Sequence, residues 1–415
     1  MSLISYLLSL TFYLIMKRIL LAISFLIGGV ASAQQDLQEQ INQLRAEIDQ
    51  LKATAPAPLP MPENEGEQPI HKKFNMYFNF QGSFDVEKAK DKDMTAKFYA
   101  RQLRWEVRGD ITDRIFYRFR HRLNKSNVAA SLDNLATATD MLYAGFRLDD
   151  KWTLTAGKLC QAWGGFEFDL NPMNIYEYSD FLQNMDNFML GAMITYTPNQ
   201  NHEFNFQITD VRNDKFETLY GTATNTISAS KAPLTYIFNW NGNLFDNLVQ
   251  TRWGGGLQSE ADGYNNWLLM LGTKLNLSKF QVFFDYMMAN EALDRLNYTP
   301  LSANGKTATP VKDAKYNSFV IKAEYQPVPH WNIFAQGMYE TAKSDLPNNE
   351  LKSIGYFAGV EYLPFEKQDL RFFLAYIGRS QDNKNTNITK SREKNNVTDN
   401  TNRVSLGLMY RIKAF

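Results

Sequence analysis

Apolar and polar residues alternate along the stretch Phe74-Asn75-Met76-Tyr77-Phe78-Asn79-Phe80-Gln81. Because successive side chains of a β-strand point to opposite faces of a sheet, a period of two gives one apolar face and one polar face. The same alternation recurs along the rest of the 415-residue chain. The pattern therefore predicts an all-β fold over residues 72–415.

About sixteen segments of roughly ten residues carry this alternation, an even number, as transmembrane β-barrels require. We predict strands near residues 73–86, 96–110, 114–123, 139–149, 151–160, 187–197, 202–211, 232–241, 246–257, 265–276, 279–289, 316–326, 330–341, 352–362, 368–379 and 402–415.

The gaps between the predicted strands differ in length by parity. Those after even-numbered strands are tight turns, such as Asp149-Asp150 and Asn241-Gly242-Asn243. Those after odd-numbered strands are mostly longer, notably 124–138, 161–186, 212–231, 290–315 and 380–401. Short periplasmic turns and longer extracellular loops are typical of outer-membrane barrels, whereas a soluble β protein has no reason to separate loop lengths in this way. The prediction is a transmembrane antiparallel barrel in the outer membrane of a Gram-negative bacterium.

The N-terminal region has the features of a secretory signal. Met16-Lys17-Arg18 precedes an apolar run from Ile19 to Val30, and Ala31-Ser32-Ala33 follows it. A basic start, an apolar core and small residues at the cleavage site predict a signal peptide over residues 1–33, with Met16 as the expected true start.

Two further segments precede the predicted barrel. Residues 34–54 place Leu37, Ile41, Leu44, Ile48 and Leu51 at alternating spacings of four and three, which predicts a short periplasmic coiled coil. Such a helix is too short to be stable alone, so it needs a neighbour. Three alternatives are open: the helix assembles the barrel into a homotrimer, it contacts the cell wall through residues 36–53, or it packs under its own barrel or stays frayed. Residues 55–71 are a stiff, Pro-rich and then acidic linker.

The charge balance and the histidines argue against several functions. The chain has 44 basic and 44 acidic residues, so any ion selectivity has to come from where these charges lie in the fold. We expect no nucleic acid among its partners. The four histidines are scattered, and no Ser/His/Asp grouping or metal-ligand spacing occurs. We therefore predict no catalytic residue, no metal and no cofactor, and hence a protein that is not an enzyme.

Strand register predicts which charged side chains face the lumen. A charge on the lipid face costs ~2–4 kcal/mol near the midplane, so basic residues within strands have to face water. The predicted pore-lining set is Arg104, Arg108, Arg118, Arg120, Arg122, Arg147, Arg371, Arg403 and Arg411. Guanidinium groups bind phosphate or carboxylate with two hydrogen bonds each, and rings of them favour anions in a pore. Glu106 is expected to neutralise part of the row.

The loop 161–186 is too apolar to lie free in solvent. We predict that it folds into the barrel and narrows it, with Gly254-Gly255-Gly256 leaving room for its close approach. The predicted constriction residues are Trp163, Gly164, Gly165, Phe166, Glu167, Asp169, Tyr176 and Tyr178. Its acidic side chains have three alternatives: to pair with the arginines, to bind a cation, or to be solvated.

Four segments resemble the phosphate-selective porin O and P family in its Bacteroidetes form, over roughly residues 70–415. They are Thr155-Ala156-Gly157-Lys158, Gly164-Gly165-Phe166-Glu167, residues 178–181 and Asn187-Phe188-Met189-Leu190-Gly191. The resemblance implies a sixteen-stranded trimer with an inward-folded third loop and an arginine ladder that guides anions. The chain departs from the family's phosphate channels in lacking a lysine-rich track and in its acidic third loop.

The predicted function is passive diffusion of small anions, phosphate among them, through an arginine-lined pore. The alternative is a general or sugar-conducting porin, in which Trp163, Phe166, Tyr176 and Tyr178 would form a stacking track. An outer-membrane hydrolase and a structural tether are further alternatives. The expected partners are outer-membrane lipid and lipopolysaccharide, small anions, and two further copies of the chain.

Overall fold

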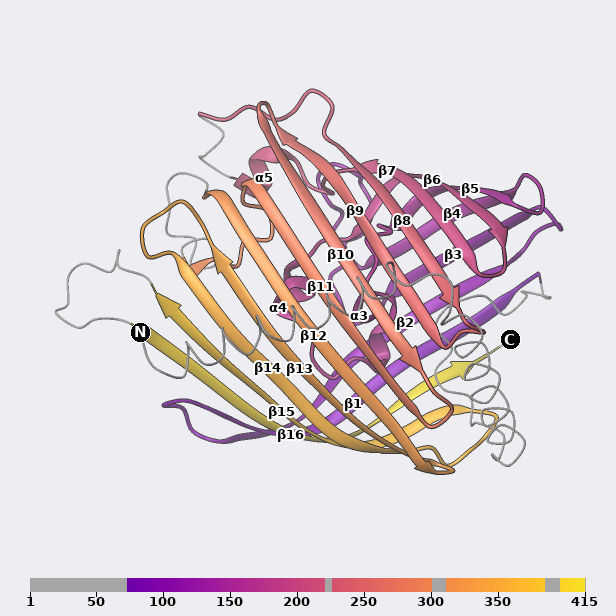
Figure 1. The fold of residues 1–415 in the computed structure, drawn as a ribbon, viewed down its shortest axis with the longest axis vertical. Helices are drawn as coiled ribbons and strands as arrows, with labels where there is room; N and C mark the ends of the chain where they lie inside the picture. Colours follow the sequence, from indigo (N-terminus) through magenta and orange to yellow (C-terminus); the bar gives the residue numbers. More distant parts are fainter. Residues whose placement is uncertain (1–72, 221–225, 301–310, 385–395, 415) are drawn as a thin grey trace, which may run out of the picture. The chain divides into compact units, whose positions relative to one another are not determined.

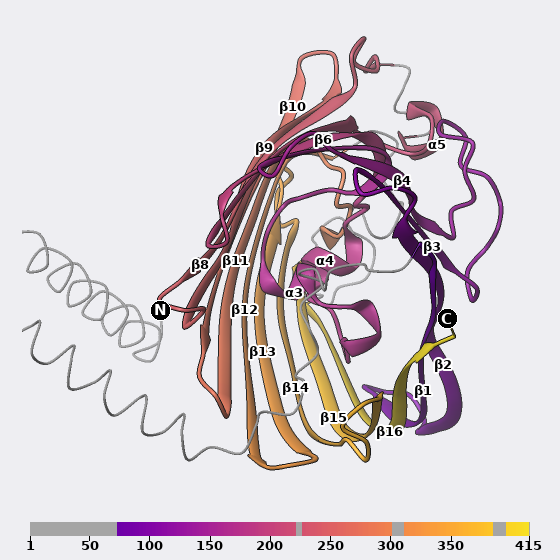
Figure 2. The same ribbon diagram turned by 90° about the vertical axis from the view of Figure 1, so that its right-hand side faces the viewer.

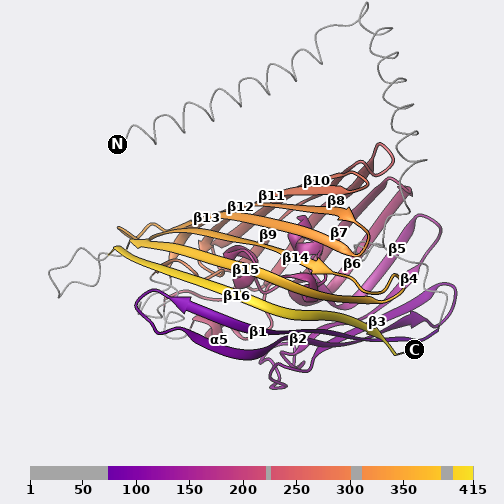
Figure 3. The ribbon, with the colours of Figure 1, turned by 90° about the horizontal axis from the view of Figure 1, so that it is seen from below.

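Sixteen antiparallel strands close into one barrel in the part of the chain that the structure describes (Figure 1). The structure is a computed structural model that describes residues 73–220, 226–300, 311–384 and 396–414. The predicted signal peptide, coiled coil and linker lie outside these residues. Each strand pairs with its neighbours in sequence, and β16 pairs with β1 to close the ring (Figure 3). The prediction of a sixteen-stranded barrel is confirmed.

The strands are β1 (Asn75–Ala89), β2 (Thr95–Asp110), β3 (Ile115–Arg122), β4 (Thr139–Arg147), β5 (Trp152–Cys160), β6 (Phe188–Asn199), β7 (His202–Asp210), β8 (Leu234–Leu244), β9 (Val249–Ala261), β10 (Tyr264–Asn276), β11 (Phe280–Leu293), β12 (Lys312–Val328), β13 (Trp331–Lys343), β14 (Glu350–Tyr362), β15 (Asp369–Lys384) and β16 (Asn396–Lys413).

Connections at the two ends of the barrel differ in length, as the gap pattern predicts. Those after even-numbered strands are tight, and His330 and Asn247 adopt positive φ angles of 67° in two of them. The longest connections follow odd-numbered strands, and one of them carries the short helix α5 (Phe216–Tyr220). None of the helices among the described residues is long and apolar enough to cross a membrane.

Strand ends are where the structure differs most from the sequence prediction. β12 begins at Lys312 rather than near 316, and β16 begins at Asn396 rather than near 402. β15 extends to Lys384 rather than 379. These extra residues are mostly polar, so no apolar alternation marks them as strand. They pair as β-ribbons that extend past the apolar band of the barrel.

The alternation assigns one face of each strand to lipid. On β15, Leu374 is 48% exposed on the outer face whereas its neighbour Phe373 is 2% exposed on the inner face. The inner face of β10–β16 is therefore far more apolar than a polar lumen predicts. Its buried apolar residues include Met270, Phe283, Met287, Val320, Phe334, Met338, Phe357, Phe373, Ile377 and Met409.

Candidate functional site: a channel between the third loop and an arginine wall

The connection between β5 and β6 folds into the barrel and covers this apolar inner face. It comprises residues 161–187 and contains α3 (Phe166–Asp169), η1 (Pro172–Asn174) and α4 (Asp180–Asn184). Figure 2 shows α3 and α4 within the ring of strands. We call this segment the third loop. The predicted inward fold is what the structure has.

Glycines on the barrel wall let the third loop approach the backbone of β9. A Cβ atom on Gly254 would lie 2.2 Å from the carbonyl oxygen of Trp163, and one on Gly256 would lie 3.1 Å from the Trp163 ring. Gly165 N donates a hydrogen bond to Arg252 O at 2.9 Å, so loop and strand backbones are in direct contact. The glycine run therefore has the role that the sequence predicts.

Carboxylates on the barrel wall hold the two helical turns of the third loop. Asp285 on β11 accepts hydrogen bonds from Phe166 N and Glu167 N, at 2.9 and 2.7 Å. Glu340 on β13 accepts from Asp180 N and Phe181 N, at 2.6 and 2.9 Å. The first N–H groups of a helix have no partner within it, so these carboxylates satisfy donors that burial would otherwise leave unpaired.

Aromatic packing fixes the centre of the third loop. The Tyr176 ring stacks on Phe334 at a centroid distance of 4.3 Å and meets Phe373 edge-on at 5.1 Å. Its hydroxyl donates to Glu361 at 2.7 Å. Trp163 and Phe166 are 0% and 2% exposed. These two rings pack against the barrel, so the stacking track for sugars imagined from the sequence does not form in this arrangement.

The acidic side chains of the third loop have partners within the barrel. Asp169 pairs with Arg252 at 2.8 Å, Glu177 pairs with Arg403 at 2.8 Å, and Asp180 pairs with Arg379. Glu167 is buried and accepts hydrogen bonds from Ser179 N, Ser179 Oγ and Gln336 Nε2, at 2.9, 2.7 and 3.1 Å. Burial raises the pKa of the Glu167 carboxyl above its ordinary value. Of the three alternatives, these contacts favour pairing with arginine. The arginines are Arg252, Arg379 and Arg403 rather than those of β2 and β3.

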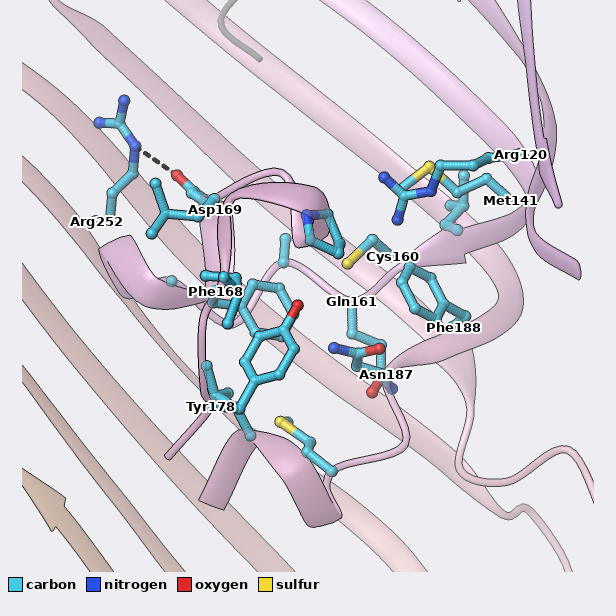
Figure 4. Close-up of a pocket in the computed structure, with 18 of the residues that line it drawn as sticks. Arg120, Met141, Cys160, Gln161, Phe168, Asp169, Tyr178, Asn187, Phe188 and Arg252 are labelled. Atoms are coloured by element: carbon cyan, nitrogen blue, oxygen red, sulfur yellow. Dashed lines mark hydrogen bonds and ion pairs between the residues drawn. The ribbon is translucent and has the colours of Figure 1, made fainter. Parts of the chain in front are cut away.

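The space left beside the third loop is a cavity of about 1460 Å³. It lies between the loop and the inner faces of the strands from β1 to β9, with Arg403 of β16 at its border. Figure 4 shows Arg120 and Met141 on the barrel wall and, across the cavity, Phe168 and Tyr178 of the third loop. This cavity is the candidate path for solutes.

Arginines of β2 and β3 border the cavity, and we call them the arginine wall. It comprises Arg101, Arg104, Arg118, Arg120 and Arg122. Asp140 of β4 lies behind three of them, with oxygens 3.0 Å from Arg104 Nε, 3.3 Å from Arg120 Nε and 2.8 Å from Arg122 Nε.

The carboxylates behind the arginine wall are fewer than its guanidinium groups. Glu106 lies 3.1 Å from Arg118 Nε and 3.9 Å from Arg108 Nε, and Asp85 pairs with Arg101. Six guanidinium groups, Arg108 included, thus share three carboxylates. Asp140 and Glu106 are fully buried. The face presented to the cavity is therefore positively charged, with Glu106 neutralising only part of it.

Five of the nine arginines predicted to line the pore border the cavity: Arg104, Arg118, Arg120, Arg122 and Arg403. The other four lie elsewhere. Arg108 and Arg411 lie over the Tyr77 ring, at 5.2 and 4.4 Å from its centroid. Arg371 is buried against Asp369 and Glu361. Arg147 pairs with Asp110 at 2.8 Å and is 39% exposed.

Four of the eight predicted constriction residues border the cavity: Gly164, Asp169, Tyr176 and Tyr178. Trp163, Gly165, Phe166 and Glu167 belong to the same loop but anchor it to the barrel instead. Of the eight predicted residues, four thus line the cavity and four anchor the third loop to the barrel.

Sequence reasoning missed three cationic residues at the cavity: Arg101, Lys125 and Arg252. Gln81 pairs with Gln102 and Gly82 pairs with Ala100, which leaves Arg101 in a β-bulge. Simple alternation would direct Arg101 to lipid, but the bulge changes the phase and lets it pair with Asp85 inside. The alternation around Gly82 and Arg101 gives no sign of the bulge. Arg252 is signalled only by its place beside the glycine run.

Comparison with known proteins places this architecture in a family. The model of the family "phosphate-selective porin O and P" matches residues 74–412. No curated protein matches the chain.

Several solved structures share the fold. The outer membrane channel DcaP of Acinetobacter baumannii has a TM-score of 0.57 at 10% identity, covering 82% of this chain and 97% of that one. The trimer form of the outer membrane protein OmpT of Vibrio cholerae has 0.52 at 11%, covering 82% and 99%. The anion-selective porin from Comamonas acidovorans has 0.51 at 10%, covering 82% and 99%.

At these identities the solved structures show a shared fold, and the family match extends over nearly the whole barrel. The barrel fold and the family both indicate a channel rather than an enzyme. The chain belongs to the phosphate-selective porin O and P family and is a porin of the outer membrane.

Proposed function

We propose that this porin conducts small anions, phosphate among them, by passive diffusion along the arginine wall. One observation carries the proposal: the five guanidinium groups of the arginine wall border the cavity, and among the described residues three carboxylates pair with them. The chain as a whole is neutral, with 44 basic and 44 acidic residues, whereas the cavity is bordered by eight arginines and lysines and by four aspartates and glutamates. This local excess of positive charge favours anions.

The chemistry of guanidinium suits this role. Each planar group offers several N–H donors to an oxyanion and stays charged at any physiological pH. Asp140 holds Arg104, Arg120 and Arg122 from behind, so their orientation requires no anion. A passing anion therefore meets preorganised donors, whereas a cation meets repulsion.

The test is the reversal potential in a planar bilayer under a KCl gradient. Wild-type channels should give a potential on the anion side, and added phosphate should block part of the chloride current. The double variant R118A/R120A should bring the potential towards zero. R147A is the matched control, because Arg147 does not border the cavity and its removal should leave the potential unchanged. A zero or cation-side potential in the wild type would contradict the proposal and leave a general or sugar-conducting porin.

We further propose that the porin is a homotrimer in contact with outer-membrane lipid and lipopolysaccharide, and that residues 36–53 lie in the periplasm and contact the cell wall. The trimer form of the structurally similar OmpT supports the first part. Cross-linking in native membranes should trap three copies. Deleting residues 34–69 should abolish cell-wall association while conductance stays normal, and retained association would contradict the contact.

A further inference from the structure

The cavity has a second wall that is uncharged for most of its extent. Within the described residues, no lysine or arginine of β5, β6, β7 or β8 borders the cavity. Apart from the carboxylate of Glu203 on β7, these strands contribute mainly hydroxyl and amide side chains, among them Thr153, Thr195, Thr197, Asn205, Asn239 and Asn241. We call this set the amide–hydroxyl wall. Only β4 separates its strands from β3, so both walls border the same aqueous space.

Hydrogen bonds within the amide–hydroxyl wall hold its groups in place. Thr195 Oγ1 donates to Asn205 Oδ1 at 2.6 Å, and Asn205 Nδ2 donates to Asn239 Oδ1 at 3.0 Å. Asn241 Nδ2 donates to Glu203 Oε1 at 2.8 Å. The wall is thus preorganised, and the hydroxyl oxygens of its threonines keep acceptor capacity for a donor from outside the protein.

Inorganic phosphate would engage chiefly the arginine wall, because Thr195 Oγ1, Asn205 Nδ2 and Asn241 Nδ2 already donate within the protein. Its oxygens mainly accept hydrogen bonds, which the arginine wall donates, and amide oxygens have little to offer it. The cavity of about 1460 Å³ also exceeds the ~300–1,000 Å³ of pockets that enclose a drug-sized ligand. A larger solute with an anionic end and several hydroxyl groups satisfies both walls, because a hydroxyl both donates and accepts.

Building on the proposed anion conductance, we propose that the cavity selects polyhydroxylated organic anions, such as a sugar bearing a phosphate or carboxylate group, over inorganic phosphate. The anionic end lies on the arginine wall, and the hydroxyl groups exchange hydrogen bonds with Thr153, Thr195 and Thr197. The aromatic residues buried under the third loop have no part in this recognition.

The test compares block of single-channel chloride current by glucose 6-phosphate, gluconate, inorganic phosphate and acetate. Wild-type current should be blocked by the two sugar anions at lower concentrations than by phosphate or acetate. The variant T153V/T195V/T197V removes three hydroxyl groups at nearly constant volume. It should weaken block by the sugar anions about two- to tenfold, the worth of one net hydrogen bond, and leave block by phosphate unchanged. The matched variant T153S/T195S/T197S should restore block.

Each outcome decides the inference. If only glucose 6-phosphate or only gluconate blocks the current, the proposed class of solute is supported, and the preferred anionic group is identified as phosphate or carboxylate. Phosphate that blocks as well as both sugar anions, or a valine variant that weakens all four blockers equally, overturns the inference while anion selectivity stands. A cation-side reversal potential instead overturns the proposed function. The valine variant has a folded barrel if its electrophoretic migration changes on heating and its chloride conductance equals that of the wild type.

Discussion

Replacing Gly254 with alanine should displace the third loop. The added Cβ would lie 2.2 Å from the Trp163 carbonyl oxygen and 2.8 Å from its carbonyl carbon, whereas real Cβ contacts essentially never fall below 3.0 Å. Both nearest atoms are backbone atoms, so no side-chain rotation relieves the contact. The segment around Trp163 has to move away from β9, and overpacking of this kind costs typically ~1–3 kcal/mol.

Neighbouring contacts add to the effect of G254A. The hydrogen bond from Gly165 N to Arg252 O at 2.9 Å lies beside the clash, and each hydrogen bond lost costs ~1 kcal/mol. We expect a lower thermal midpoint of barrel unfolding and a larger, noisier single-channel conductance. G337A is the matched control, since the nearest atom to its added Cβ is 3.8 Å away. Conductance and midpoint equal to those of the wild type and G337A would refute the packing argument.

Two further predictions test the walls of the cavity and the anchoring of the loop. Cys160 and Arg120 border the same cavity (Figure 4), so a negatively charged methanethiosulfonate reagent should modify Cys160 faster than a positively charged one, and R120A should reduce that rate ratio. Equal rates in the wild type would contradict a positive wall. Y176F removes the hydroxyl that donates to buried Glu361 at 2.7 Å, so unfolding should become easier by ~1–3 kcal/mol; an unchanged unfolding midpoint in Y176F would contradict the anchoring role.

The barrel could be predicted from sequence because lipid imposes its rule on every strand. Each strand has to place apolar residues outward at a period of two, so Phe372, Leu374 and Tyr376 reveal both the strand and its register. The same rule places Arg104 and Arg118 inward without any structure. Strand ends escaped prediction because the extended ribbons beyond the membrane are polar and obey no such rule.

The interior was harder to predict because its partners are distant in sequence. Phe166 N and Asp285 are 119 residues apart, and Phe181 N and Glu340 are 159 residues apart. No local pattern links them. In the sequence, strands β13–β15 have large apolar residues on both faces. This pattern indicates that the inner face is apolar, but it does not indicate which segment covers that face. Arg101 was missed because a single bulged residue reverses the phase of the alternation.

Packing of the third loop and ion selectivity are physically linked in this arrangement. The loop and the inner face of β10–β16 replace water with apolar side chains on one side of the cavity. Two unit charges 4 Å apart interact by ~1 kcal/mol in water but by ~4 kcal/mol at the effective dielectric typical near a protein surface. Excluding water therefore strengthens the pull of the arginine wall on an anion. The loop displacement expected for G254A should thus raise conductance and lower anion selectivity together, although Gly254 carries no charge and does not border the cavity.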